Sequence, residues 1–133
     1  MIAYDTNVLI YALEGTSPWS AQAQTVIEQG EQEGAILSVL AWQELMTGAV
    51  LNDADNCKKL ATILDEFNST KFTPVSLSIS KRAVALTKQY GKQVYGYDAI
   101  HIANAIEHKA KSFITNDQKL LSLNIKEIEI CSL

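Results

Sequence analysis

The sequence predicts an α/β protein in which helices cover both faces of a parallel β-sheet. Short apolar runs, typical of buried strands, alternate along the chain with longer stretches whose apolar residues recur at helical spacing. Strands separated by helices are joined by crossover connections, which favour parallel pairing and a three-layer α/β/α sandwich. The chain has 133 residues and no linker or repeat, so we expect a single domain over residues 1–133.

The first half of the chain contains two expected strands and four expected helices. Asn7 and Ser20 are candidate N-caps for the first two helices, and Gly30 and Gly34 are expected to end the second one. Helical spacing predicts that Trp42, Leu45, Met46 and Ala49 form the apolar face of the third helix. The predicted elements are a strand over 1–4, helices over 8–13 and from 20 to the glycines, a strand over 35–38, and helices over 39–51 and 54–67, the last including Leu60, Ile63, Leu64 and Phe67.

The second half continues the alternation. Pro74 favours an edge position for the next strand, and either Ser76 or Ser78 begins a helix that Gly91 closes. A helix with a stripe of Ile100, Ala103 and Ile106 follows. The predicted elements are a strand over 72–75, helices over 76–90 and 97–109, a strand over 112–115, helical turns over 118–123 and a strand over 125–130.

The composition restricts the classes of function. The formal charge of −4 argues against a protein that grips nucleic acid through net charge alone, although carboxylates gathered around a cation would also lower the net charge. Cys57 and Cys131 lack metal-ligand spacing and are expected to be free thiols, which favours a reducing compartment. We see no signal peptide and no membrane span, so we expect a cytoplasmic protein.

Four scattered acids are the candidate functional residues. Asp5 directly follows the first strand, and Asp117 stands two residues past the strand that ends at Thr115. Functional sites of open parallel sheets lie beyond the carboxyl ends of the strands, so both acids should lie at one edge. Asp98 begins the helix that leads into that strand, and Glu44 lies in the first two turns of the helix after the second strand. We therefore expect the four carboxylates to converge.

Converging carboxylates repel one another, and a hard divalent cation relieves that repulsion. Mg²⁺ or Mn²⁺ prefers oxygen ligands and retains bound water. Such a site suits phosphodiester hydrolysis, because the cation activates water and stabilises the leaving oxygen. The pattern thus predicts a metal-dependent phosphoesterase.

Each acid also has a purely structural interpretation. Asp98 and Asp117 are candidate N-caps, and Asp5 is the hardest acid to assign a merely structural role. Taken alone, Glu44 belongs to a solvated helix face, because it lies far around the helix from the apolar stripe. For His101 we favour a helix-surface or supporting role over that of a general base, and we expect His108 to be exposed.

Other classes of site lack support in the sequence. There is no Ser-His-Asp or Cys-His arrangement, and neither GxGxxG nor GxxxxGK[ST] occurs. The start DTN lacks the second Asp, two positions on, of haloacid-dehalogenase-like phosphatases. A nucleotide-binding Rossmann domain therefore ranks last.

The chain resembles the PIN-domain ribonucleases, most closely the toxin component of VapBC-type toxin–antitoxin pairs. The matching stretches are YDTNVLIYAL, SVLAWQELMTG, YGYDAIHIANA and FITNDQKL, in this order along nearly the whole chain. The resemblance implies a Rossmann-like PIN fold with a five-stranded parallel sheet. It also implies an endoribonuclease that binds Mg²⁺ or Mn²⁺, usually as a homodimer, and a small antitoxin whose C-terminal segment lies along the active-site groove.

The resemblance also assigns roles to residues. It implies that Asp5, Glu44, Asp98 and Asp117 form the acidic metal site. Thr6 is expected to orient Asp5, while Thr115 and Asn116 are expected to support the ligands. Lys81, Arg82, Lys88, Lys92, Lys109, Lys111 and Lys119 are the candidate RNA contacts, each with an ordinary solvated surface as its alternative.

Two alternative functions stay open at the level of sequence. One is a metal-dependent nuclease or phosphatase that acts on DNA or small phosphoesters. The other is a non-enzymatic RNA- or protein-binding module that keeps the fold. The second alternative predicts that acid-to-amide substitutions leave the biological effect unchanged.

Overall fold

The computed structural model of the chain describes residues 1–65 and 70–133. Its centre is a five-stranded parallel sheet with the strand order β3-β2-β1-β4-β5. This arrangement confirms the predicted α/β fold with a parallel sheet. The strands are β1 Ile2–Tyr4, β2 Ala35–Ser38, β3 Thr70–Thr73, β4 Ser112–Thr115 and β5 Glu129–Ser132.

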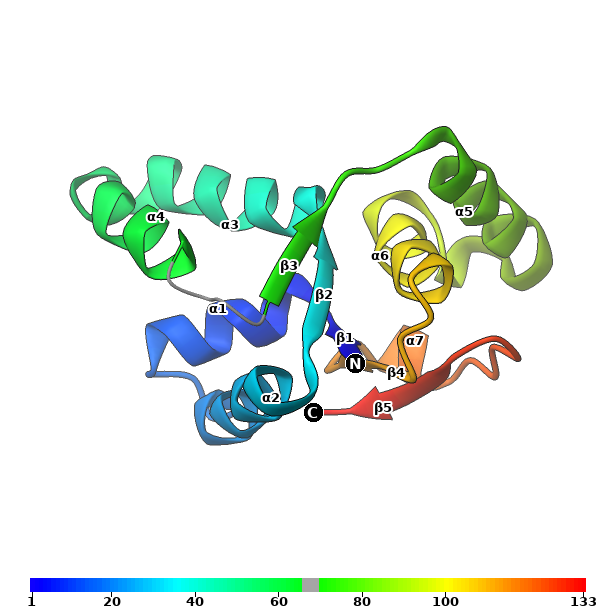
Figure 1. Ribbon diagram of the computed structural model, residues 1–133, viewed down its shortest axis with the longest axis horizontal. Coiled ribbons are helices and arrows are strands. Elements are labelled where there is room, and N and C mark those ends of the chain that lie inside the picture. Colours follow the sequence, from blue (N-terminus) through cyan, green and yellow to red (C-terminus); the bar gives the residue numbers. More distant parts are fainter. Residues whose placement is uncertain (66–69) are drawn as a thin grey trace.

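Helices cover both faces of the sheet and complete the three layers (Figure 1). Alternate strand residues point to opposite faces: Ile2 and Tyr4 pack with the first set of helices, whereas Ala3 packs with the second. The first set is α1 Thr6–Glu14, α2 Ser20–Glu33, α3 Val39–Asn52 and α4 Cys57–Asp65. The second set is α5 Leu77–Tyr90, α6 Gly96–Glu107 and α7 Gln118–Leu121, and the short 3₁₀ turns η1 Ala54–Asn56 and η2 Gly91–Gln93 complete the elements.

The order in which strands are added to the sheet changes side at β1. From β1 the chain proceeds to β2 and β3 on one side, and after α5 and α6 it returns to β4 on the other side. The backbone N–H of Asp5 donates to the carbonyl of Ile114 over 2.9 Å, which fixes the carboxyl end of β1 against β4. In open α/β sheets this change of side is where a ligand crevice forms.

Some predicted helix caps were wrong. Helix α1 begins at Thr6 with Asp5 as its N-cap residue, so Asn7 is an exposed residue inside the helix. Ser20 lies inside α2, where its hydroxyl accepts a hydrogen bond from the Ser17 N–H. Gly30 is also inside α2. A Cβ at this position would lie 3.0 Å from the Ala35 Cβ, so the glycine is required by close packing and not by a helix end.

The strands at the two edges are displaced from their predicted positions. Strand β3 is an edge strand as expected, but it ends at Thr73, so Pro74 follows it instead of lying within it. Strand β5 begins only at Glu129, because Ile125 and Ile128 are both buried in the core. A spacing of three between inward residues does not fit a strand, in which inward residues alternate.

The predicted stripe of α6 was incomplete. Ala103 is buried as expected, but Ile100 and Ile106 are only partly buried, while Ala99 and Ile102 are buried. More than one face of α6 is covered, because the helix packs against both the sheet and α5. Its buried residues therefore extend beyond a single stripe. The helix predicted over 54–67 is divided into η1 and α4, and Phe67 lies outside the described residues.

Both cysteines are free, as expected. Among the described helices, none has the length and apolar character that crossing a membrane requires.

Candidate active site

Asp5 and Asp117 are joined through one buried threonine. The Thr115 hydroxyl donates to Oδ2 of Asp5 over 2.9 Å and accepts from the backbone N–H of Asp117 over 3.0 Å. Thr115 is fully buried and Asp5 is only 7% exposed. Because Thr115 ends β4 and Asp5 follows β1, this contact lies between the two strands at which the strand order changes side.

Glu44 is held by a second set of polar side chains. Its Oε1 accepts from the Thr6 hydroxyl at 3.1 Å and lies 2.7 Å from Nε2 of His101. On the other side of the imidazole ring, Nδ1 lies 3.0 Å from the hydroxyl of Ser38, the last residue of β2. Helices α1 and α6 therefore contact the Glu44 carboxylate of α3 directly, and strand β2 is linked to it through His101.

Asp98 shows that the four acids influence one another. It lies in the first turn of α6 and is partly buried. Burial raises the pKa of the Asp98 carboxyl, and the negative charges of Asp5, Asp117 and Glu44 raise it further, while His101 opposes them. The fold thus brings the four predicted acids near enough to repel one another.

Helix ends partly offset this repulsion. Asp5 is the N-cap residue of α1, Asp98 lies in the first turn of α6, and Asp117 is the N-cap of α7. The N-terminus of a helix carries a partial positive charge that stabilises a nearby anion. Three of the four acids therefore occupy positions at which the backbone favours a carboxylate.

The carboxylate oxygens of the four acids are suitable ligands for a hard divalent cation. The side chains, however, are not positioned around a common centre. In residues 1–65 and 70–133, no three His, Cys, Asp or Glu side chains are arranged so that they could hold a metal ion. Repulsion between charges acts over several ångströms, whereas a carboxylate oxygen must come within about 2.1 Å of Mg²⁺. A bound cation would therefore have to pull the carboxylates inward.

The structural alternatives for the acids have different outcomes. The N-cap of α6 is Tyr95, so the capping interpretation of Asp98 was wrong. Asp117 does cap α7, since its carboxylate accepts from the Lys119 N–H over 2.8 Å, and its charge also raises the pKa of Asp98. Glu44 is not on a merely solvated face, because it bonds to two buried side chains.

The supporting residues differ from expectation in part. Thr6 bonds to Glu44 and not to Asp5, and it is Thr115 that orients Asp5. Asn116 is partly buried and its side chain has no hydrogen bond to a described residue. His101 is 5% exposed, so the helix-surface interpretation was wrong, and His108 is partly buried with Nδ1 2.9 Å from the Asn104 carbonyl oxygen.

Sequence reasoning missed Ser38. The residue ends β2 and is buried at the same sheet edge as Asp5, where it contacts His101. The signal was present, because any polar residue that closes a parallel strand is a candidate for this edge. Strand β2 was identified from its apolar residues, and its last residue, a serine, was not considered as a site residue.

A groove leads away from Glu44 between α1, α3 and α4. Its volume is about 660 Å³, and its lining combines apolar side chains with polar ones. The lining residues are Ile10, Leu13, Glu14, Thr16, Glu44, Leu45, Gly48, Ala49, Asn52, Asp53, Asn56, Lys59, Leu60 and Ile63. Of the four acids, Glu44 alone lines this groove. The groove therefore adjoins the acidic site at Glu44.

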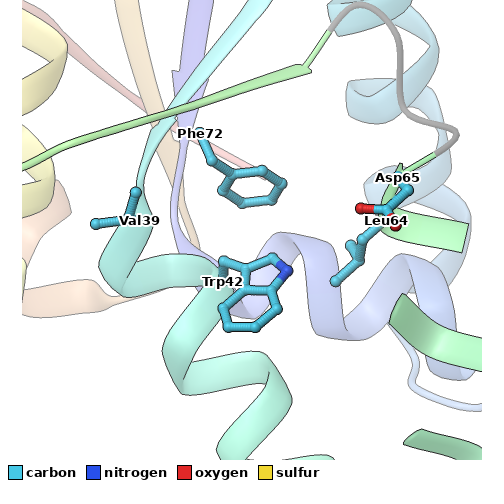
Figure 2. Close-up of a pocket in the computed structure, with 5 residues that line it drawn as sticks. All are labelled: Val39, Trp42, Leu64, Asp65 and Phe72. Atoms are coloured by element: carbon cyan, nitrogen blue, oxygen red, sulfur yellow. The ribbon is translucent and has the colours of Figure 1, made fainter. Parts of the chain in front are cut away.

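A separate hollow of about 270 Å³ lies between α3, α4 and β3. Figure 2 shows Phe72 and Trp42 facing this hollow, with Val39 on α3 and Leu64 and Asp65 on α4. Trp42 is 41% exposed, so it was wrongly predicted to face the core together with Leu45. None of the four acids lines the hollow, which is therefore distinct from the candidate active site.

Two of the candidate RNA contacts already have acidic partners. Arg82 pairs with Glu107 at 3.1 Å, and Lys111 pairs with Glu33. The exposed lysines Lys81, Lys88, Lys92, Lys109 and Lys119 stay candidates for contact with a polyanion.

Comparison with known proteins supports the interpretation of the fold. A family model described as PIN domain matches residues 2–126. No curated protein matches the chain. A toxin-antitoxin complex from Klebsiella pneumoniae aligns with a TM-score of 0.70 and 24% identity, over 98% of this chain and 100% of that chain.

Two further solved structures share the fold. VapBC2 from Rickettsia felis, bound to a DNA fragment from its promoter, has a TM-score of 0.76 and 19% identity over 100% of this chain and 99% of that chain. FitAcB from Neisseria gonorrhoeae has a TM-score of 0.74 and 19% identity over 98% and 96% of the two chains. At these identities the likeness establishes the fold alone.

Proposed function

The chain belongs to the PIN domain family, and from that premise we propose that it is a metal-dependent endoribonuclease, the toxin of a toxin–antitoxin pair. PIN domains are generally nucleases. The observation that carries the proposal is the placement of the acids at one sheet edge, where the Thr115 hydroxyl bonds to Asp5 and to the backbone of Asp117; the raised pKa of Asp98, caused by burial and then by the neighbouring acids, agrees with it. Carboxylates gathered in this way are the ligands of a hard divalent cation.

The proposed metal ligands are Asp5, Glu44, Asp98 and Asp117, acting directly or through water. When Mg²⁺ or Mn²⁺ is bound, it supplies a water molecule of lowered pKa and a positive charge for the phosphodiester oxygens. Thr115 holds Asp5 in place through its hydroxyl, and the same hydroxyl fixes the backbone before the Asp117 carboxylate. The Asp5 carboxylate is thereby oriented, and the backbone of Asp117 is fixed, before the substrate arrives.

The carboxylate of Asp5 provides the sharpest test. We expect Asp5→Asn to lower the rate of RNA cleavage by at least about 100-fold, since loss of even an indirect metal contact costs about 10- to 100-fold. Cleavage of a defined RNA in Mg²⁺ or Mn²⁺ measures the effect. Asp55→Asn is the matched control, because Asp55 is exposed and outside the site. Full-rate cleavage by Asp5→Asn would refute the proposal.

A substrate panel tests the finer statement about RNA. Single-stranded DNA and a small phosphodiester are offered beside the RNA under the same conditions. Preferential cleavage of RNA supports the endoribonuclease. Preferential cleavage of DNA or the small ester would assign the site to another kind of phosphoesterase.

We propose that a cognate antitoxin occupies the groove beside Glu44. The groove lies between three helices, and its apolar residues Leu13, Leu60 and Ile63 suit the apolar face of a peptide segment. The solved structures of the same fold include toxin–antitoxin complexes. A segment lying in this groove would reach Glu44 and block access to the acids.

The groove proposal predicts the effect of a charge placed within it. Leu13→Arg should weaken binding of the antitoxin at least about 10-fold, because a buried apolar contact is replaced by an unpaired charge. Titration calorimetry with the product of a short neighbouring reading frame measures the affinity. Lys71→Glu, on the exposed side of β3, is the control, and equal affinity of Leu13→Arg and the unaltered chain would contradict the proposal.

A homodimer also stays a prediction. Its support is the exposure of apolar side chains on the face formed by α5 and the start of α6. Val84 and Tyr95 are 69% and 62% exposed and line a hollow of about 580 Å³ there.

A further inference from the structure

His101 is a buried polar residue with a partner on each ring nitrogen. The Glu44 carboxylate lies at Nε2 and the Ser38 hydroxyl lies at Nδ1. Buried polar atoms are costly unless they are hydrogen-bonded, and the described residues contain no buried side-chain nitrogen or oxygen that lacks a partner. The histidine is therefore fully engaged at this position.

The partners determine which nitrogen donates. An ionised carboxylate only accepts hydrogen bonds, so Nε2 must carry the proton that is directed at Glu44 Oε1. In the neutral ring, Nδ1 then accepts the hydrogen bond of the Ser38 hydroxyl. The Glu44 carboxylate thus determines the tautomer, and the Ser38 hydroxyl, which can donate as well as accept, holds the other side of the ring.

The two donors to Glu44 converge on one oxygen. His101 and Thr6 both direct their protons to Oε1, and no described residue hydrogen-bonds to Oε2. Two donors fix the rotation of the carboxylate and leave the second oxygen available. A carboxylate that binds a cation through one oxygen is often supported in this manner at the other.

We propose that His101, held by Ser38, is a positioning residue that orients Glu44 so that Oε2 can bind the cation. The inference rests on the proposed function, because it assigns His101 a role in the same metal site. His101 itself contacts neither the substrate nor the cation. Its effect passes through Glu44.

A matched pair of substitutions separates this role from simple packing. The amide nitrogen of glutamine can take the place of Nε2, whereas the shorter asparagine reaches only the place of Nδ1. His101→Gln therefore retains a donor for Glu44, and His101→Asn retains only the Ser38 contact. We expect His101→Asn to weaken Mn²⁺ binding about 10-fold or more and His101→Gln to stay within about 3-fold of the unaltered chain.

Two measurements are made on each variant. Electron paramagnetic resonance of free Mn²⁺ gives the affinity without reference to catalysis. The Mg²⁺ concentration for half-maximal RNA cleavage should rise in parallel for His101→Asn. Equal weakening in both variants would assign His101 a packing role, and unchanged affinity in His101→Asn would also overturn the inference.

Ser38→Ala provides an independent variant should His101→Asn fail to fold. It removes the hydroxyl that holds the imidazole ring at Nδ1 and should raise the half-activating Mg²⁺ concentration by about 3-fold or more. Unchanged values in Ser38→Ala would then overturn the inference. If the unaltered chain cleaves RNA and binds Mn²⁺, a negative result concerns His101 alone. If it does neither, the proposed function fails and the inference fails with it.

Discussion

At the residue scale, Asp98 is the acid whose environment is least favourable to its charge. Folding raises its pKa, first through burial and then through Asp5 and Asp117. An acid with a raised pKa binds protons more readily in the folded state than in the unfolded state. The free energy of unfolding therefore falls as pH rises from the ordinary aspartate pKa of 3.8 through the raised value.

Replacing Asp98 by Asn should stabilise the protein in the absence of divalent cations. The amide removes the repulsion, so we expect the melting temperature at pH 7 in chelator to rise by roughly 2–4 °C. The gain should shrink as pH is lowered toward 3.8, where the unaltered carboxyl also becomes neutral. Differential scanning fluorimetry across that pH range measures it.

Asp55→Asn serves as the control for this experiment, because that acid is exposed and is not among the charges that act on Asp98. It should leave the melting temperature nearly unchanged. A lower melting temperature for Asp98→Asn would mean that the carboxylate stabilises the start of α6.

The sequence predicted which acids gather, but not how they are supported. Asp5 and Asp117 follow buried strands, so the rule for parallel sheets places them at one edge. Glu44 and His101 are 57 positions apart, and their contact depends on how α3 and α6 cross the end of the sheet. Local periodicity contains no information on that crossing, so taken alone it assigned Glu44 to a solvated face and left a helix-surface or a supporting role for His101.

At the element scale, the start of α5 provides a test of one helix cap. The sequence left Ser76 and Ser78 as alternatives, and the fold selects Ser76, whose hydroxyl accepts from the Ile79 N–H over 3.2 Å. Ser76→Ala should lower the free energy of unfolding by about 1 kcal/mol. Urea denaturation measures the difference.

Ser78→Ala is the matched control on the same helix. Its hydroxyl bonds to Glu107 at an exposed position, so we expect a loss of less than about 0.5 kcal/mol. A larger loss for Ser78→Ala than for Ser76→Ala would mean that the helix begins later than described.

Element types were predictable, whereas several boundaries were not. Strands β1, β2 and β4 are buried on both faces, and short apolar stretches within them identified them in the sequence. The edge strands β3 and β5 are partly exposed and lack this signal. For β5 the buried residues Ile125 and Ile128 flank a turn at residues 126–127, and in the sequence they resembled the start of a strand.

At the scale of the whole molecule, the proposed function predicts a link between cations and stability. A cation that binds only the folded state stabilises it by mass action, by about 2.7 kcal/mol at 100 times its dissociation constant. Millimolar Mg²⁺ or Mn²⁺ should therefore raise the melting temperature of the unaltered chain by several degrees. Scanning fluorimetry with and without cation measures this change.

Asp5→Asn should show a much smaller rise, because one of the four proposed ligands is lost. Equal rises in both proteins would place the stabilising cation elsewhere on the surface. The fold of the variant is checked by circular dichroism in chelator.

The bond from Thr115 to Asp5 joins residues 110 positions apart. Strand β1 is translated well before its neighbour β4, because strands β2 and β3 and helices α1 to α6 lie between them in sequence. A nascent chain that stops before residue 112 lacks both Thr115 and Asp117. Residues 1 to 117 must therefore all be translated before the four acids can assemble, so a shorter nascent chain cannot carry the complete acidic cluster.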